Sequence, residues 1–568
     1  MKPLIYQIFT RLYGNHNKAK NVPNGSINEN GCAKLNDITL SQLKRISSFG
    51  FTHVWFTGLI EHATQTDYSA YGIQQDHPAI VKGKAGSPYA IKDYYDIDPD
   101  LSTDVNKRMK EFEALLKRTH QAGLKMVIDF VPNHVARQYH SDAKPRGISD
   151  LGENDDKRMS FSPQNNFYYL EGQTLHTDFD TERKAKQPYS EYPAKATGNN
   201  CFNAWPNKND WYETIKLNYG IDYQGGGQTH FSPIPSTWKK MTDILLFWAK
   251  KGVDAFRCDM AEMVPTEFWQ YAIEKIKKTY PHTLFIAEVY NPGEYRRYIA
   301  SGFDYLYDKV GLYDTLRAII TEGRSASCIT GCWQSVDDIR EHMLNFLENH
   351  DEQRIASAYF AGDARKALPA LVVSAMMGNN PFMVYAGQEV GESSMEAEGF
   401  SGLDGRTTIF DYWSVKSLNK LTSANLDKEL SQEETSLYRY YKRIITLCHS
   451  QPALNDGVFY DLQYANYAND MGYNCDRNYA FIRKNQKGQT LLIVSNFDAH
   501  AVHIGVRIPE HAFSFLSLKS GLVSATDLIS GNSQTVELKA DSPTYVDVPA
   551  YGSVVLQVSK AKYVSEHS

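Results

Sequence analysis

Short apolar runs alternate with amphipathic stretches along roughly the first 450 residues, a spacing that suits strands followed by helices. In Asp104–Ala122 and Ser236–Lys251 the apolar residues recur every three or four positions, which predicts helices with one buried face. A third stretch of this kind, Glu433–His449, closes the series. Strands that alternate with helices are typical of a parallel sheet, because each helix returns the chain to the same end of the sheet.

Eight of the apolar runs are predicted to be barrel strands. Their number and their alternation with helices predict an α/β fold, a (β/α)8 TIM barrel that closes on itself. The expected strands are Leu4–Phe9, Thr52–Thr57, Lys125–Phe130, Gly252–Phe256, Thr283–Glu288, Phe303–Asp308, Met343–Glu348 and Pro381–Tyr385.

The strands are unevenly spaced, and this divides the chain into three parts. Residues 135–235, between the third and fourth strands, are rich in Asn, Asp, Gly, Tyr and Trp and predict an inserted subdomain. A long excursion inside a compact domain is usually functional, so we expect the insert to form a wall of the active cleft. The barrel then comprises residues 1–134 and 236–453. Short runs separated by turns predict a C-terminal all-β sandwich over residues 454–568, with strands at Tyr479–Arg483, Thr490–Ser495, Ala501–Ile508 and Ser553–Val558.

Composition narrows the partners of the protein. The chain has 568 residues, too many for one core, so two or three structural units are expected. Its net charge of -6 comes without a long basic run, which argues against nucleic acid as a partner. No uninterrupted apolar stretch reaches the ~18 residues of a membrane span, so no membrane partner is expected.

Cysteine usage and the N-terminal residues bear on localisation. The seven cysteines are widely scattered, which predicts reduced thiols rather than a disulfide scaffold. The first residues, MKPLIYQIFT, show no export signal. Together these two features predict a cytoplasmic protein, and the oligomeric state is left open.

Four of the expected strands end in charged or amide side chains. The third strand runs into DFVPNH at residues 129–134, the fourth into FRCD at 256–259, the fifth into IAEV at 286–289 and the seventh into ENHD at 348–351. A lone acidic residue at a strand end is usually a turn or capping residue. Several carboxylates at strand ends of one barrel, however, meet at its C-terminal face, where barrel enzymes place their active sites.

Arg257 is expected beside one of these carboxylates. It lies two residues before Asp259, and alternate side chains of a strand point to the same face. A cation near a carboxylate favours the ionised form, so we expect Arg257 to keep Asp259 ionised. A purely structural ion pair is the alternative interpretation.

Through these four motifs the sequence resembles the α-amylase family of glycoside hydrolases. The run GFTHVWFT at residues 50–57 is also similar to the family's second-strand motif, and the resemblance covers the whole chain. It implies a barrel with a B subdomain inserted after the third strand and a C-terminal β-sandwich. These are the places where the hydrophobic pattern predicts an insert and an all-β module.

The resemblance implies retaining hydrolysis by three carboxyl groups. It makes Asp259 the nucleophile, Glu288 the general acid/base and Asp351 the residue that stabilises the transition state. Retaining hydrolysis requires the first two carboxyls to lie about 5–5.5 Å apart. No organic cofactor takes part, and the implied substrate is an α-glucan or maltooligosaccharide with mainly α-1,4 bonds.

The resemblance also implies four substrate-binding residues. His134 and His350 match histidines that hydrogen-bond the sugar, Tyr89 matches a stacking tyrosine, and Arg257 lies among them. Ser87 stands where the family has a histidine, so one sugar hydrogen bond is expected to be missing.

Two departures from the family pattern bear on metal binding and on specificity. Many members hold a calcium ion between barrel and insert, and Asn133 matches one of its ligands. Lys216, however, stands where an aspartate ligand is expected, and its ammonium supplies a positive charge at that place, which argues against calcium. The usual Lys-His pair after the nucleophile is Glu262-Met263 here, so recognition of the leaving-group sugars is expected to differ.

The motifs leave more than one activity open. A glucanotransferase or isomerase uses the same glycosyl-enzyme intermediate as a hydrolase and differs in the acceptor. A non-catalytic glucan-binding protein typically lacks one of the carboxylates, all of which are present here. In the insert, Trp205, Trp211 and Tyr219 are expected either in sugar subsites or in the core of the subdomain.

Overall fold

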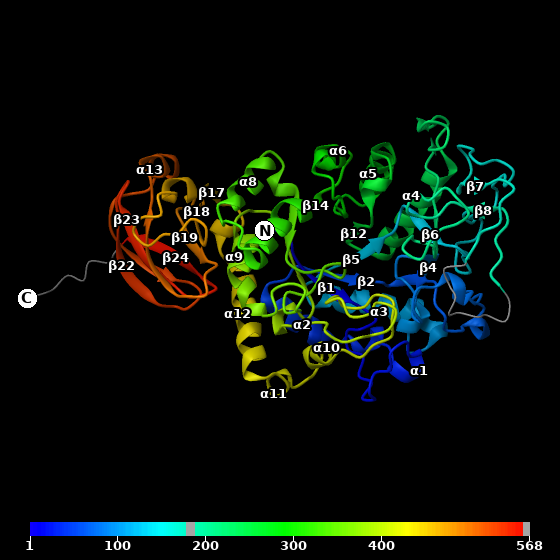
Figure 1. The fold of residues 1–568 in the computed structure, drawn as a ribbon, viewed down its shortest axis with the longest axis horizontal. Helices are drawn as coiled ribbons and strands as arrows, with labels where there is room; N and C mark the ends of the chain where they lie inside the picture. The colour runs from blue at the N-terminus through cyan, green and yellow to red at the C-terminus, as the bar shows by residue number, and fades with distance from the viewer. Residues whose placement is uncertain (178–187, 561–568) are drawn as a thin grey trace, which may run out of the picture.

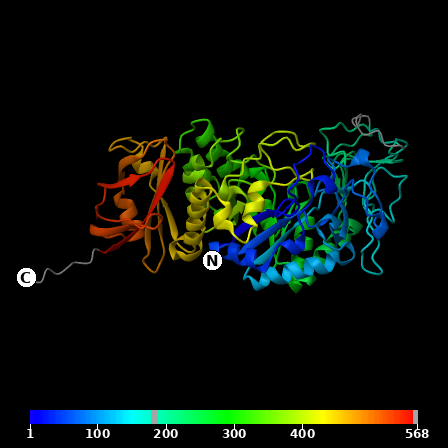
Figure 2. The same cartoon turned by 90° about the horizontal axis from the view of Figure 1, so that it is seen from below.

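The computed structural model describes residues 1–177 and 188–560 and arranges them in three parts along one axis (Figure 1). The barrel lies in the middle, the insert at one end and the C-terminal sheets at the other. Figure 2 shows the same order from a second side. Residues 178–187 of the expected insert and 561–568 of the expected sandwich lie outside the described residues.

All eight expected barrel strands are present. They are β1 (Leu4–Phe9), β2 (His53–Thr57), β5 (Lys125–Phe130), β12 (Ala255–Cys258), β13 (Leu284–Ala287), β14 (Tyr305–Tyr307), β15 (Met343–Phe346) and β16 (Phe382–Tyr385). They pair in parallel and close in the order β1, β16, β15, β14, β13, β12, β5, β2. The predicted barrel is therefore confirmed.

Helices cover the outside of the barrel. α4 (Ser236–Lys251) has the predicted bounds, and α12 (Gln432–Ser450) extends the predicted helix by one residue at each end. α3 (Arg108–Gln121) begins later than expected, because Asp104 caps a 3₁₀ turn at Val105–Lys107 instead of the α-helix. Further covering helices are α2 (Leu40–Phe49), α5 (Thr266–Thr279), α7 (Asp314–Thr321) and α9 (Leu368–Met376).

A hairpin that the hydrophobic pattern did not predict follows β2. β3 (Ile60–His62) pairs in antiparallel fashion with β4 (Ile91–Ile97). Every residue of both strands is buried, including Glu61, Asp93 and Asp96. Charged residues at buried positions remove the alternation of apolar and polar residues, so periodicity does not reveal these strands.

The insert consists of short antiparallel pairs. β6 (His134–Ala136) pairs with β9 (Thr214–Lys216), and β7 (Tyr169–Leu170) pairs with β8 (Ala194–Lys195). The pairing of β6 with β9 brings residues 214–216 of the insert back to the end of the third barrel strand. The insert has a small hydrophobic core of its own, made by Leu170, Leu175, Ala194 and Ala204.

Two sheets follow the barrel, as expected for a sandwich. The larger contains β17 (Val458–Asp461), β18 (Asn478–Lys484), β19 (Thr490–Asn496), β24 (Gly552–Lys560), β21 (Gly521–Asp527) and β22 (Ser533–Leu538). The smaller contains β20 (Val502–Arg507) and β23 (Pro543–Val548). The buried Arg483 of β18 donates to the carbonyl of Met376 in α9 at 2.7 Å, so the sandwich is fastened to the barrel.

The cysteines agree with the expectation of reduced thiols. All seven lie within the described ranges and are free. Cys328 and Cys332 share α8 (Cys328–Ser335), where the thiol of Cys332 contacts Thr315 and the carbonyl of Cys328. Over the described part of the chain, no helix combines the length and the apolar character that crossing a membrane requires.

Candidate active site

The three expected catalytic carboxyls line one cavity at the C-terminal end of the barrel. Asp259 directly follows β12, Glu288 directly follows β13, and Asp351 lies in the loop after β15. The cavity measures about 300 Å³. Tyr89 and His134 also line it, whereas Arg257 and His350 are not among its lining residues. Parallel strands thus bring together residues that lie far apart in the sequence.

Arg257 contacts all three carboxyls from the buried side. Its Nη1 donates to Asp259 Oδ1 at 2.9 Å. Its Nη2 lies 3.1 Å from Glu288 Oε2 and 3.9 Å from Asp351 Oδ2. One buried guanidinium therefore lies within 4 Å of all three carboxyl groups. The aromatic rings that enclose the guanidinium belong to Trp55, Tyr89 and Tyr307.

Burial and the crowding of negative charge raise the pKa values of two of the three carboxyls. Burial, and after it the charge of Glu288, raises the pKa of Asp259 well above its usual range. Burial and Glu288 also raise the pKa of Asp351 to about 7. Arg257 acts on the pKa of Asp259 in the expected direction, but the other two effects outweigh it. Arg257 therefore favours ionised Asp259, as predicted, but does not set the net shift, because crowded carboxylates around one cation do not all ionise together.

His350, Tyr89 and Asp129 form a hydrogen-bonded chain beside the cavity. Gln7 Nε2 donates to His350 Nδ1 at 2.8 Å, which assigns the proton of the neutral ring to Nε2. This Nε2 lies 2.6 Å from Tyr89 Oη and 3.2 Å from Asp351 Oδ2. Tyr89 Oη in turn donates to Asp129 Oδ1 at 3.2 Å. Burial lowers the pKa of His350 well below its usual value, so the ring is neutral.

His134 reaches the cavity from the end of β5. Its Nε2 lies 3.9 Å from Asp259 Oδ2, and its ring packs against Trp211 with centroids 5.2 Å apart. Burial, and after it the charge of Lys216, lowers the pKa of His134 to about 3. Both expected histidines are therefore uncharged at neutral pH and suit hydrogen bonding rather than ion pairing.

The structure adds three residues to this site that the sequence did not predict: Asp129, Tyr290 and Met260. Asp129 accepts a hydrogen bond from Trp55 Nε1 at 2.9 Å. Tyr290 donates through its hydroxyl to Glu288 Oε1, and the N–H of Met260 donates to Glu288 Oε2 at 2.8 Å. The sequence motifs already pointed to two of them, because Asp129 is the first residue of the DFVPNH motif and Tyr290 lies two residues after Glu288.

The insert forms one wall of the cavity, as expected. Trp211, Glu213 and Thr214 line it. The other two aromatic residues considered for subsites do not, since Trp205 is exposed on the surface and Tyr219 is buried in the core. Of the three, only Trp211 is placed to contact a ligand in the cavity.

Glu262 holds the loop that follows β13. Its Oε1 accepts from the N–H of Tyr290 at 3.2 Å, and its Oε2 accepts from the N–H of Asn291 at 3.1 Å. Glu262, which stands where the family has the lysine of a Lys-His pair, thus provides a carboxylate that positions Tyr290. Ser87 lines the cavity, and its Oγ accepts from the N–H of Tyr89 at 3.1 Å.

The candidate calcium ligand Asn133 is engaged by protein groups. Its Oδ1 accepts a hydrogen bond from the ammonium of Lys216. Its Nδ2 donates to the carbonyl of Gly198 at 2.9 Å and lies 3.1 Å from His134 Nδ1. Burial lowers the pKa of Lys216 to about 7. A divalent cation on the same oxygen would be repelled by the ammonium, so these residues do not fit a calcium site.

The sequence of the chain matches a known family over most of its length. The family model described as the alpha-amylase catalytic domain matches residues 7–457. The chain belongs to the alpha-amylase family of glycoside hydrolases. Its family membership agrees with the strand-end motifs and with the barrel, insert and C-terminal sheets described above.

Relatives within the alpha-amylase family are distant. Alpha-amylase 3 of Dictyoglomus thermophilum is 23% identical over 392 residues, which cover 65% of this chain and 68% of the relative. Neopullulanase 2 of Thermoactinomyces vulgaris is 21% identical over 415 residues, covering 72% and 57%. The alpha-amylase of Streptomyces lividans is 25% identical over 561 residues, covering 91% and 55%. The chain therefore spans just over half the length of two of these relatives.

Solved structures of similar proteins share the fold over the full chain. The alpha-amylase of Geobacillus thermoleovorans, complexed with acarbose, has a TM-score of 0.63 at 18% identity and covers 99% of both chains. The native Nostoc punctiforme debranching enzyme has a TM-score of 0.64 at 17% identity and covers 98% of both. At these identities the likeness establishes the fold alone.

Proposed function

We propose that this protein is a retaining glycoside hydrolase that cleaves α-glucosidic bonds, mainly α-1,4, in starch-derived glucans or maltooligosaccharides. The observation that carries the proposal is the pairing of Asp259 and Glu288 on one cavity, with Arg257 between them at 2.9 and 3.1 Å. A guanidinium that contacts both carboxyls keeps them close, as a retaining mechanism with a separation of about 5–5.5 Å requires. The names of the relatives, an alpha-amylase and a neopullulanase, point to the same class of substrate.

The proposed reaction has two halves. In the first, Asp259 attacks the anomeric carbon while Glu288 gives its proton to the glycosidic oxygen, and the cleaved chain leaves with that proton. A covalent glycosyl-enzyme remains. In the second half Glu288 takes a proton from water, whose oxygen attacks the anomeric carbon and releases Asp259. The carboxyls thus return to their starting protonation state.

The shared proton of the carboxyl cluster supports these roles. The first step requires one ionised and one protonated carboxyl side by side, and the raised pKa values of Asp259 and Asp351 favour retention of a proton among these carboxyls. Met260 and Tyr290 donate to Glu288 from two sides and fix its orientation. A carboxyl whose position is fixed is suited to proton transfer to one particular oxygen.

The surroundings of the carboxyls suit a sugar ring. Tyr89 and Trp211 present aromatic rings to the cavity, and the apolar face of a sugar packs well on such rings. His134 lines the cavity as a neutral ring, and Asp351 is its most exposed carboxyl, with 36% of the side chain accessible. These groups are placed to hydrogen-bond sugar hydroxyls, while Asp351 stabilises the positive charge of the transition state.

The proposed reaction uses no organic cofactor and no calcium ion at Asn133. The ammonium of Lys216 occupies the hydrogen-bonding position on Asn133 Oδ1 that a cation would take. It also lies on β9, whose pairing with β6 fastens the insert to the barrel. The side chain of Lys216 therefore bridges the barrel and the insert, as a bound cation would.

Product analysis tests the proposed activity. The wild-type chain is incubated with maltoheptaose, alone and with maltose as an added acceptor, and separately with pullulan. Glu288→Gln is run in parallel, and Glu113→Gln, a surface glutamate of α3 that is 49% exposed, serves as the matched control. We expect shorter maltooligosaccharides from wild type and Glu113→Gln and none from Glu288→Gln.

The other outcomes separate the alternatives. Products longer than maltoheptaose, increased by maltose, would assign the chain to the glucanotransferases. Cleavage of pullulan at its α-1,6 bonds would change the bond preference. Turnover that survives in Glu288→Gln at the wild-type rate would contradict the assigned acid/base, and no turnover in any sample would contradict the proposed function.

A further inference from the structure

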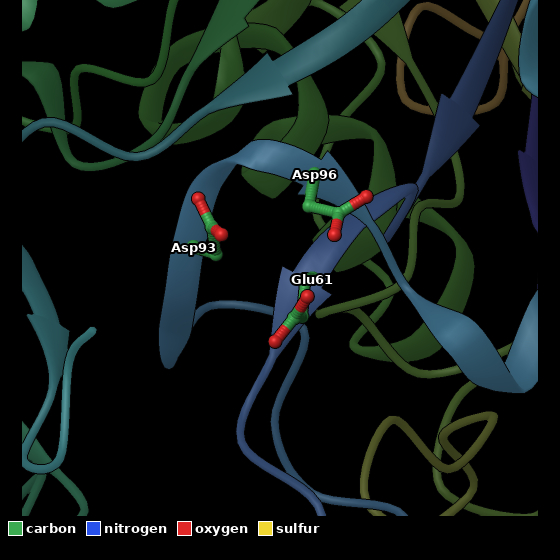
Figure 3. Close-up of side chains that lie close together, drawn as sticks. All are labelled: Glu61, Asp93 and Asp96. Atoms are coloured by element: carbon green, nitrogen blue, oxygen red, sulfur yellow. The ribbon is translucent and has the colours of Figure 1, made fainter. Parts of the chain in front are cut away.

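A cluster of three carboxyl groups outside the active site lies in the β3–β4 hairpin. Glu61 comes from β3, and Asp93 and Asp96 come from β4, as Figure 3 shows. Their exposed fractions are 1%, 0% and 2%. One oxygen from each carboxyl lies within 4.8 Å of the others. Charges buried this deeply are costly unless they are paired or bind a metal ion.

Among the described residues, the carboxylates of Asp93 and Asp96 have hydrogen-bond partners, whereas that of Glu61 has none. Asp93 accepts from Ser141 Oγ at 2.6 Å and from three backbone N–H groups. Asp96 forms a salt bridge with Arg108 at 2.6 Å. Within the described residues, neither carboxylate oxygen of Glu61 has a hydrogen-bond partner, although both are buried. A glutamate in this condition points to a ligand in the cluster.

The charges around the cluster leave two negative charges without compensation. When all three carboxyls are ionised, as a bound cation requires, they carry three negative charges, and Arg108 supplies one positive charge, so two remain. Lys92 also lies on β4, but its ammonium pairs with Asp76 at 3.1 Å. A single divalent cation supplies the missing charge.

We propose that the β3–β4 hairpin binds one calcium ion through Glu61, Asp93 and Asp96. Calcium takes oxygen ligands at about 2.3–2.6 Å, so two ligands on one ion lie up to about 5 Å apart. The limit of 4.8 Å between the carboxylate oxygens agrees with this spacing. Magnesium holds its ligands at about 2.0–2.1 Å and keeps several waters, which fits poorly with carboxylates buried on all sides.

A calcium ion at this place joins elements that surround the active site. Asp93 accepts from the N–H groups of Asp142 and Ala143 at 2.8 and 3.1 Å, and these residues belong to the start of the insert. Asp96 holds the first turn of α3 through its salt bridge. Tyr89, which lines the cavity, lies two residues before β4. The ion therefore stabilises the fold and one wall of the cavity, at a place distinct from Asn133.

Calcium titration of the full-length protein tests the proposal. The protein is stripped with EGTA and titrated with CaCl2 in a calorimeter, and its thermal midpoint is measured with and without calcium. We expect one ion per chain and a rise in the midpoint of about 2–5 °C at saturating calcium. Glu61→Gln keeps the shape and removes one charge, so its calcium affinity should fall at least about tenfold and most of the shift should disappear.

Glu398→Gln is the matched control. Glu398 is also a buried glutamate, 3% exposed, with a carboxylate oxygen that has no hydrogen-bond partner in the described ranges. It lies in the loop after β16 rather than in the hairpin. Its replacement should leave both the calcium affinity and the calcium-dependent shift at their wild-type values.

Two results overturn the proposal. One is the absence of calcium binding to the stripped wild-type protein, which needs no variant. The other is wild-type calcium affinity in Glu61→Gln. In either case Glu61 carries a proton instead, and Glu61→Gln should unfold at or above the wild-type temperature without calcium. If Glu61→Gln does not fold, Asp96→Asn replaces it, and unchanged affinity in that variant overturns the proposal in the same way.

Discussion

The ammonium of Lys216 donates a hydrogen bond to Oδ1 of Asn133 at the junction of barrel and insert. Asn133 immediately precedes β6, and Lys216 ends β9, where it pairs with His134. Both side chains are buried. The contact therefore links the end of the third barrel strand to β9 of the insert without a bound ion.

Lys216→Ala should destabilise the protein by about 2–4 kcal/mol, because it removes a packed apolar stem and leaves the buried Asn133 Oδ1 without a donor. Lys216→Met should recover only the share of the lost unfolding free energy that comes from packing of the aliphatic part of the lysine side chain. Calorimetric unfolding at pH 6 measures both. Lys239→Ala, an exposed lysine of α4, is the control and should stay within about 0.5 kcal/mol of wild type. If Lys216→Ala proves as stable as this control, Lys216 does not stabilise the junction of barrel and insert.

The hydrophobic pattern predicted the barrel because its strands and helices have clear periods. It missed the β3–β4 hairpin, where Lys92, Asp93 and Asp96 occupy buried positions. Asp93 and Asp96 contact residues distant in sequence, Ser141 and Arg108, and no local pattern predicts such contacts. The hairpin is also where we propose the calcium ion. The secondary structure that local periodicity did not predict is thus a segment with a proposed binding function.

The strand-end residues of the site were predictable, because parallel strands fix where their ends meet. The position of Trp211 on the cavity and of Trp205 on the surface was not, because it depends on how the insert folds back. The sign of the pKa shift of Asp259 was also missed, because it depends on burial and on Glu288 from the next strand. The cytoplasmic location stays a prediction.

Glu288→Gln should slow hydrolysis of maltooligosaccharides by about 10²–10⁴-fold, because an amide gives no proton to the leaving oxygen. The loss in kcat/KM, which reports formation of the glycosyl-enzyme, should be much smaller on a dinitrophenyl maltoside, whose leaving group departs without a proton. Asp259→Asn should lose activity on both substrates, since no nucleophile remains. Steady-state rates on the two substrates measure this. Equal losses on both for Glu288→Gln would assign the acid role to another residue.

Gln7→Glu should reverse the hydrogen bond that fixes the tautomer of His350. A carboxylate accepts from Nδ1 instead of donating to it, so Nε2 no longer donates toward Tyr89 or Asp351. We expect kcat/KM to fall about tenfold, the effect of one misdirected hydrogen bond of about 1.4 kcal/mol. The new carboxylate should also add an ionisation of His350 to the pH profile.

Gln42→Glu is the control for that variant. Gln42 is another buried glutamine, and its side-chain amide donates to the carbonyl of Thr422 at 2.9 Å, away from the cavity. It introduces the same buried charge, so it shares any loss of stability but should keep the wild-type pH profile. A Gln7→Glu protein whose pH profile matches wild type would show that Gln7 does not set the tautomer.

Asp351→Asn should stabilise the protein at alkaline pH while it removes activity. The pKa of Asp351 is raised from an ordinary value of 3.8 to about 7, so between these values the folded chain holds a proton that the unfolded chain has released. Wild-type stability from this group is therefore present below pH 4 and is lost as the pH rises through 7. An asparagine has no such dependence. Above pH 7 the variant should be more stable by about 1 kcal/mol, a value reduced for the 36% exposed side chain.

Thermal unfolding of wild type and Asp351→Asn at pH 4 and pH 8 measures this difference. The two midpoints should nearly coincide at pH 4, where Asp351 is protonated in the folded chain, and separate at pH 8 in favour of the variant. Asp314→Asn serves as the control, because that carboxylate is 41% exposed, pairs with Lys309 at 2.9 Å and lies outside the cluster. A separation that is the same at both pH values would mean that Asp351 does not share the proton of the cluster. Asp351 would then be ionised throughout this pH range, and its role would be confined to stabilising the transition state.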